Sequence, residues 1–285
     1  MRRRIGIAIV AGVAALGAVE AAERSGEPRP ADAVAREGAA ATAPAPARAT
    51  ASPVPSPSPE RAALLDAAPR RVQAPPGRAP RDARGLIAKV PAGTRLPVLD
   101  RPGGSVVGRA GDRTDFGSRT ALTVFETRGG GRWIGVATDA RPPGRLGWIR
   151  VPAGRLDWYR TDRSLHVDVS ERRMELRDGR RVLRSATVGV GRPSTPTPTG
   201  RFGVTDRLLG TDFGYWYGCC IIAFTGIQPN LPPGWQGGNR IGVHGTSSAA
   251  GIGAASSAGC LRAGDDVLER LMTGLPLGAP VHIRR

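Results

Sequence analysis

Two side chains near the C-terminal end of the sequence could together carry out acyl transfer. Cys260 stands in Ser256-Ser-Ala-Gly-Cys-Leu-Arg262, and His244 stands in Ile241-Gly-Val-His-Gly-Thr246. A thiol becomes a strong nucleophile when a nearby imidazole takes its proton or holds it as an ion pair. Backbone N–H groups can then stabilise the oxyanion of the acyl intermediate, and Gly259 permits close backbone approach beside the sulfur. The two side chains are 16 residues apart, so only the fold can bring them together.

The other two cysteines, Cys219 and Cys220, are adjacent in the chain. With three cysteines in all, at least one thiol must be left over, and Cys260 is the candidate for that role. The pair precedes the apolar run Ile221-Ile-Ala-Phe224, which favours small core residues in a buried strand. A vicinal disulfide or a redox role is the alternative.

The remaining histidines do not indicate a metal site. His166 and His282 each stand in an alternating, strand-like run, which favours structural positions. Three histidines without clustered carboxylates or paired Cys-x-x-Cys motifs form no zinc signature. We expect neither a metal nor another cofactor.

Three blocks of the sequence together resemble one known family, the L,D-transpeptidase catalytic domain with the YkuD-type fold. The resemblance covers essentially residues 164–285. The blocks are the opening strand pair with its turn at Asp178-Gly179, the segment Gly189-Val-Gly191 through Thr195-Pro-Thr-Pro-Thr-Gly200, and His244-Gly-Thr followed by Ser257-Ala-Gly-Cys-Leu-Arg262. From its own residues, Thr195 to Gly200 is expected to be a structural turn, because prolines fix φ and glycine permits unusual angles.

The resemblance implies a two-step transfer on peptidoglycan. Cys260 attacks the carbonyl after the third residue of a tetrapeptide stem and releases the terminal D-alanine, and an acceptor amine then resolves the thioester. On this mapping His244 is the base, the Gly245 carbonyl orients its ring, and the N–H groups of Gly259 and Cys260 form the oxyanion hole. Arg262 organises the loop or binds a substrate carboxylate. The further substrate-binding candidates are Ser257, Thr246, Tyr215 and Trp216, and the aromatic run that includes the last two could instead pack beneath the loop.

The sequence departs from the family pattern at one position. Family members commonly carry Ser-His-Gly-Cys, whereas Ala258 takes the place of that second residue here. Because His244 serves as the base, the missing imidazole bears on rate and inhibitor sensitivity more than on reaction class. In the family, that second histidine assists near the oxyanion hole or supports the site. Loss of one such hydrogen-bond donor can reduce the rate about a hundredfold.

The elements that must position these residues are mainly strands. Leu165–Val169, Arg173–Leu176 and Arg181–Val190 alternate apolar and polar residues, which predicts an antiparallel meander with a tight turn at Asp178-Gly179. One short C-terminal helix follows, capped by Asp265 or Asp266. Its apolar residues Val267, Leu268, Leu271 and Met272 recur at helical spacing. We therefore predict a mainly β protein.

The chain divides into four predicted parts: a signal peptide or anchor (1–22), a Pro/Ala-rich disordered linker (23–85), a small β-barrel-like module (86–160) and the catalytic domain (164–285). The positive start and short apolar run are typical of an export signal. The linker composition buries too little apolar surface to offset the entropy of ordering it. Within the module, Gly144-Arg-Leu-Gly-Trp-Ile149 resembles the closing strand of bacterial Src-homology-type barrels. We expect an exported protein at the cell wall or in the periplasm, touching the membrane only through an uncleaved N-terminal segment.

The net charge of +17 at pH 7 would suit any anionic polymer. Lys89 is the only lysine, and the other 40 basic residues are arginines scattered without long runs. No basic patch is interleaved with aromatic residues, so a cell-wall polymer fits better than nucleic acid. Two other functions stay open beside the transpeptidase: a thiol L,D-carboxypeptidase that transfers to water, and a non-catalytic cell-wall-binding protein.

Overall fold

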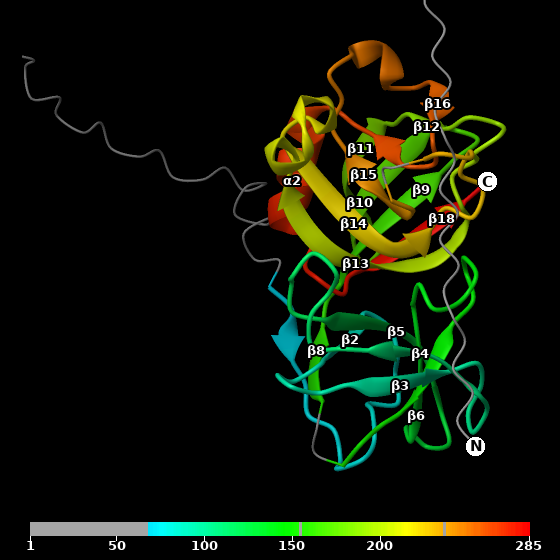
Figure 1. Ribbon diagram of the computed structural model, residues 1–285. Coiled ribbons are helices and arrows are strands. Elements are labelled where there is room, and N and C mark those ends of the chain that lie inside the picture. The colour runs from blue at the N-terminus through cyan, green and yellow to red at the C-terminus, as the bar shows by residue number, and fades with distance from the viewer. Residues whose placement is uncertain (1–67, 154–155, 236–237) are drawn as a thin grey trace, which may run out of the picture. The chain divides into compact units, whose positions relative to one another are not determined.

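The computed structural model describes residues 68–153, 156–235 and 238–285 (Figure 1). Strands dominate these residues, and one α-helix accompanies them together with three short 3-10 helices. The prediction of a mainly β protein with one short C-terminal helix is therefore confirmed. The predicted signal segment and residues 23–67 of the predicted linker lie outside the described residues. Among residues 68–153, 156–235 and 238–285, no helix is both long and apolar enough to cross a membrane.

The first sheet lies in the N-terminal part of the described chain. Its strands are β1 (Arg70–Arg71), β2 (Leu86–Lys89), β3 (Leu96–Leu99), β4 (Val106–Ala110), β5 (Ala121–Arg128), β6 (Trp133–Val136), β7 (Gly147–Arg150) and β8 (Asp157–Arg160). They pair in the order β1-β8-β2-β5-β6-β7-β3-β4, with every neighbour antiparallel. Arg70 pairs with Arg160, and Ala79 is buried in this sheet's core, so folded structure begins inside the range predicted as linker. The likeness to Src-homology barrels stays a prediction.

The second sheet carries the residues of chemical interest. Its strands are β9 (Arg163–Asp168), β10 (Arg173–Asp178), β11 (Arg181–Thr187), β13 (Gly200–Leu209), β14 (Cys220–Ile227), β15 (Arg240–His244), β17 (Leu261–Arg262) and β18 (Pro280–Arg284). They pair in the order β11-β10-β9-β18-β13-β14-β15-β17. A separate pair joins β12 (Val190–Gly191) to β16 (Ala255–Ser257) in parallel. The remaining elements are η1 (Gly210–Phe213), η2 (Tyr215–Tyr217), η3 (Ala249–Gly251) and α2 (Asp265–Gly274).

The predicted meander at the start of this sheet is confirmed. β9, β10 and β11 pair antiparallel in succession, and Gly179 turns the chain between β10 and β11 with φ +56°. Alternate residues of each strand face the core because successive side chains point to opposite sides of a sheet. Leu165, Val167 and Met174 are accordingly buried among the apolar side chains of the second core.

Helix α2 packs on β14 (Figure 1). Val267, Leu268 and Leu271 are buried. The predicted cap is wrong, since Gly264 is the N-cap residue and no side chain caps the helix. The Asp265 carboxylate instead accepts a hydrogen bond from the Cys219 backbone N–H, at 3.1 Å. An interaction with a distant loop has replaced the local cap.

Candidate active site

Strand pairing brings His244 and Cys260 together. β15 ends at His244 and pairs in parallel with β17, with Val243 opposite Leu261 and His244 opposite Arg262. Cys260 directly precedes β17. Val243 and Leu261 point into the core, so the alternating pleat turns His244, Cys260 and Arg262 toward the opposite face. The fold thus unites two groups that are distant in sequence.

The His244 ring is held in one tautomer. Its Nδ1 lies 2.6 Å from the Gly245 carbonyl oxygen, and the side chain is 9% exposed. A carbonyl oxygen only accepts, so Nδ1 carries the proton and Nε2 keeps its lone pair in the neutral ring. Burial lowers the pKa of His244; the hydrogen bond to Gly245 opposes this shift, and the positive Arg262 adds to it. The imidazole is therefore neutral and able to accept a proton at Nε2.

Cys260 is a free, partly buried thiol. Its Sγ donates to the carbonyl of Arg240 at 3.8 Å, and Arg240 is the first residue of the strand that ends at His244. Burial raises the pKa of the Cys260 thiol, while a hydrogen bond from the Gly242 backbone and the charge of Arg262 act in the opposite direction. Both directions favour the uncharged forms of the thiol and of the imidazole.

The loop before Cys260 is fixed by buried hydrogen bonds. Ser257 is 2% exposed, and its hydroxyl donates to the Cys260 carbonyl at 2.6 Å while accepting from the Gly259 N–H at 3.0 Å. The Ser257 carbonyl accepts from the Thr195 hydroxyl at 3.0 Å. In this state Ser257 holds the loop, and the Gly259 N–H already has a partner. Its use in an oxyanion hole, like the substrate-binding role of Ser257, stays a prediction.

Gln228 holds the same loop and was missed in the sequence. It is 4% exposed, and its Nε2 donates to the carbonyls of Pro196 at 2.9 Å and Ala258 at 3.2 Å. Gly259 has φ +120°, and a Cβ there would lie 2.2 Å from Gln228 Nε2. The detectable signal is a lone polar residue directly after the apolar strand that ends at Ile227.

A second missed residue is Tyr217, which was only grouped with its aromatic neighbours. Its ring meets the His244 ring edge to face, with centroids 4.8 Å apart. Burial raises the pKa of Tyr217, and the nearby Cys260 raises it further. Tyr217 therefore lies beside both reacting groups, whereas Tyr215 and Trp216 are 76% and 53% exposed.

The remaining predicted site residues have local partners. Thr246 exchanges hydrogen bonds with Ser248, at 3.0 and 3.2 Å, and shapes the turn after His244. Arg262 Nη1 lies 3.4 Å from the Ser256 hydroxyl, and its backbone pairs with Gly189. The positive charge of Arg262 lowers the pKa of both His244 and Cys260. Across the described ranges, no group of three or more His, Cys, Asp or Glu residues is arranged to hold a metal ion.

Comparison with known proteins matches this part of the chain to one family. Residues 162–283 match the family model YkuD, the L,D-transpeptidase catalytic domain. This part of the chain is similar to the catalytic domain of that family. The putative L,D-transpeptidase YkuD of Bacillus subtilis (strain 168) is 29% identical over 140 residues, which is 48% of this chain and 74% of that protein.

Solved structures resemble the L,D-transpeptidase domain more distantly. The Ldtfm-avibactam carbamoyl enzyme is 19% identical with a TM-score of 0.33, and the match covers 44% of this chain. The chain spans 49% of the length of that protein. An L,D-transpeptidase from Mycobacterium smegmatis is 16% identical over 51% of this chain and 76% of its own, with a TM-score of 0.35. The enzyme class, L,D-transpeptidase, is indicated by the match to the family model and does not rest on these structures.

Proposed function

We propose that the chain is a cysteine L,D-transpeptidase that cross-links peptidoglycan stem peptides, with Cys260 as nucleophile and His244 as base. The observation that carries the proposal is the His244 tautomer: Nδ1–H is bound to the Gly245 carbonyl, which leaves Nε2 to take the thiol proton. The free Cys260, next to the strand paired with β15, is the adjacent nucleophile.

The first step forms a thioester. Cys260 Sγ gives its proton to His244 Nε2 and bonds to the carbonyl carbon after the third stem residue. The tetrahedral oxyanion collapses, the C–N bond to the terminal D-alanine breaks, and His244 returns the proton to the leaving amine. In the second step an acceptor amine attacks the thioester and loses a proton to His244. An amide cross-link forms, and the thiol is regained.

Export accompanies this proposal, because stem peptides lie outside the cytoplasmic membrane. The positive n-region and apolar run within residues 1–22 support it. The net charge of +17 suits anionic wall polymers as partners of the exported protein.

The test is intact-protein mass spectrometry of the chain mixed with a disaccharide-tetrapeptide donor. We expect a thioester adduct that is absent from Cys260→Ala, and acylation slowed about a hundredfold or more in His244→Gln. Ser248→Ala, an exposed change near the same turn, is the control. No adduct and no D-alanine release from the native chain would reject catalysis and favour a wall-binding protein.

Product analysis separates the two enzymes. With an acceptor stem present, a transpeptidase accumulates cross-linked dimers. A carboxypeptidase instead yields only tripeptide stems and free D-alanine at the same rate with or without the acceptor.

A further inference from the structure

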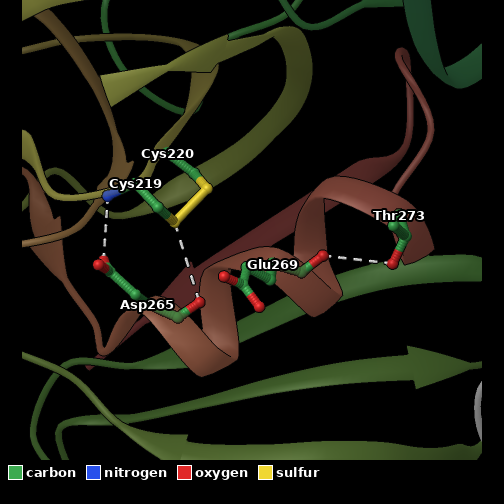
Figure 2. The surroundings of a disulfide bond; sticks show 5 residues. All are labelled: Cys219, Cys220, Asp265, Glu269 and Thr273. Carbon is green, nitrogen blue, oxygen red and sulfur yellow. Dashed lines mark hydrogen bonds between the residues drawn. A yellow bond between two sulfur atoms is a disulfide. The ribbon is translucent and has the colours of Figure 1, made fainter. Parts of the chain in front are cut away.

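Cys219 and Cys220 are joined by a disulfide at the start of β14 (Figure 2). The sequence favoured two small core residues at these positions, whereas the structure contains the vicinal disulfide that was the alternative. A bond between adjacent residues closes a small ring that includes their peptide group. The orientation of that peptide is therefore restricted, and the Cys220 carbonyl group is attached directly to the Cα of this ring.

Asp265 holds the peptide group that enters this ring. Its Oδ1 accepts from the Cys219 N–H at 3.1 Å, and its backbone oxygen lies 3.9 Å from the Cys219 sulfur (Figure 2). The second distance is a contact only, because a disulfide sulfur carries no proton. We call Cys219, Cys220 and Asp265 the latch.

The latch is in direct contact with the residue that orients His244. The Cys220 carbonyl accepts from the Gly245 N–H at 3.3 Å. A Cβ on Gly245 would lie 2.6 Å from Asp265 Oδ1 and 2.6 Å from the Gly218 Cα. The two backbones therefore touch with no room for a side chain between them.

The same Gly245 residue binds the catalytic base through its other polar group. Its carbonyl accepts from His244 Nδ1 at 2.6 Å. A continuous path of contacts thus runs from the disulfide through the Cys220 carbonyl and the Gly245 peptide to the imidazole.

We propose that the latch is a positioning element for His244, which rests on the proposed function. With the disulfide closed, the Cys220 carbonyl holds the Gly245 peptide, and Gly245 keeps the proton of His244 on Nδ1. Without it, the Gly245 peptide gains freedom, and the imidazole loses its fixed tautomer and orientation. Acyl transfer then slows although Cys260 and His244 are both present.

The latch is also sensitive to dithiols. A small dithiol reductant supplies two electrons and two protons: the bond between Cys219 and Cys220 breaks, two thiols form, and the dithiol becomes a disulfide. Cys260 is already a thiol, so this reagent changes the latch and leaves the nucleophile as it was.

The experiment compares the oxidised full chain with Cys219→Ser/Cys220→Ser and with Asp265→Ala. One measurement is the rate of Cys260 acylation by the disaccharide-tetrapeptide donor, and we expect a loss of about tenfold or more in both variants. The other measurement is the ¹⁵N NMR signature of His244. The native ring should carry its proton on Nδ1, and the variants should populate the Nε2–H tautomer.

Two further variants separate positioning from general damage. Asp265→Asn keeps an oxygen that can accept from the Cys219 N–H, so it should retain most of the native rate. Asp266→Ala is the matched control, because Asp266 is the next residue of α2 and bonds Arg184 at 2.9 Å instead of the latch. Circular dichroism and melting curves verify that each variant is folded. If Cys219→Ser/Cys220→Ser does not fold, the native chain treated with the dithiol takes its place.

A native Nδ1–H tautomer in the folded variants would overturn the proposal, whatever their rates. A native chain that forms no acyl adduct would reject the proposed function, while the tautomer comparison would still decide the role of the latch.

Discussion

At the scale of single residues, the site consists of a neutral acid and a neutral base whose pKa values are both displaced by burial. Burial lowers the pKa of His244 and raises that of Cys260. Both directions favour the uncharged groups, so in the proposed mechanism the nucleophile is generated by proton transfer during the reaction.

The pH dependence of acylation follows from these directions. A lowered pKa keeps His244 unprotonated at lower pH, so the acid limb of kcat/KM should have its midpoint below about 6.5, the ordinary value for histidine. The midpoint of the alkaline limb should lie above the ordinary pKa of a thiol, because the raised pKa keeps Cys260 protonated to higher pH. Initial rates between pH 4 and 10 check this; an acid midpoint above 7 would contradict it.

Tyr217 should act on the base mainly through its ring. An edge-to-face aromatic pair contributes about 0.5–1.5 kcal/mol beyond its buried area. Tyr217→Ala should therefore slow Cys260 acylation roughly tenfold, and Tyr217→Phe, which keeps the ring, should cost less than about threefold. Tyr215→Ala is the exposed control. A loss in Tyr217→Phe equal to that in Tyr217→Ala would instead assign the effect to the hydroxyl.

At the scale of elements, the nucleophile depends on how β17 and its preceding loop are held. The β12 and β16 pair, the buried Ser257 hydroxyl and the Gln228 side chain all fix the backbone before Cys260. These side chains add hydrogen bonds to the short ladder between β12 and β16.

Gly259→Ala tests how tightly this loop is packed. The φ of +120° is costly for alanine, and the new Cβ would lie 2.2 Å from Gln228 Nε2. We expect a loss of about 3 kcal/mol or more in the free energy of unfolding, measured by denaturant titration, together with loss of acylation.

The control for that prediction is Gly179→Ala. Gly179 has φ +56° with no neighbour within 4 Å of the added Cβ, so it should cost only about 1–2 kcal/mol. If Gly259→Ala and Gly179→Ala lose the same free energy of unfolding, the contact with Gln228 contributes nothing to the cost at Gly259.

At the scale of the whole molecule, stability is linked to two stacked histidines far from the nucleophile. His166 on β9 and His282 on β18 face each other in the parallel register, with ring centroids 4.8 Å apart. Desolvation, followed by His282 and Arg177, lowers the pKa of His166 to about 4. Desolvation also lowers that of His282, and Arg201 and Arg177 add to the effect.

The folded protein therefore binds fewer protons than the unfolded chain between pH 6.5 and about 4. Stability should fall as the pH decreases through that range, because the unfolded state gains protons first. We expect the melting temperature to drop by several degrees between pH 7 and pH 4.5. His166→Gln removes one of the titrating groups, so its melting temperature should depend less on pH. A native melting temperature equal at both pH values would show that the pair does not control stability.

Much of this molecule could be predicted from local patterns. The alternation in Leu165–Val169 and Arg173–Leu176 determined the meander, since strand periodicity and the turn at Asp178-Gly179 are local properties. The apolar spacing in Val267–Met272 likewise determined the helix and its buried face. The motifs around His244 and Cys260 indicated the resemblance to the L,D-transpeptidase family, and the family model matches the same part of the chain.

Only the tertiary structure decided how those residues are held. Asp265 reads as a local cap, but its carboxylate accepts from Cys219, and Cys219 bonds Cys220 where the sequence left two states open. Gln228 and Ser257 lie 29 residues apart in the chain yet fix the same loop. Hydrogen bonds of this kind join groups whose distance is set by strand order, and strand order is a global property that no local pattern contains.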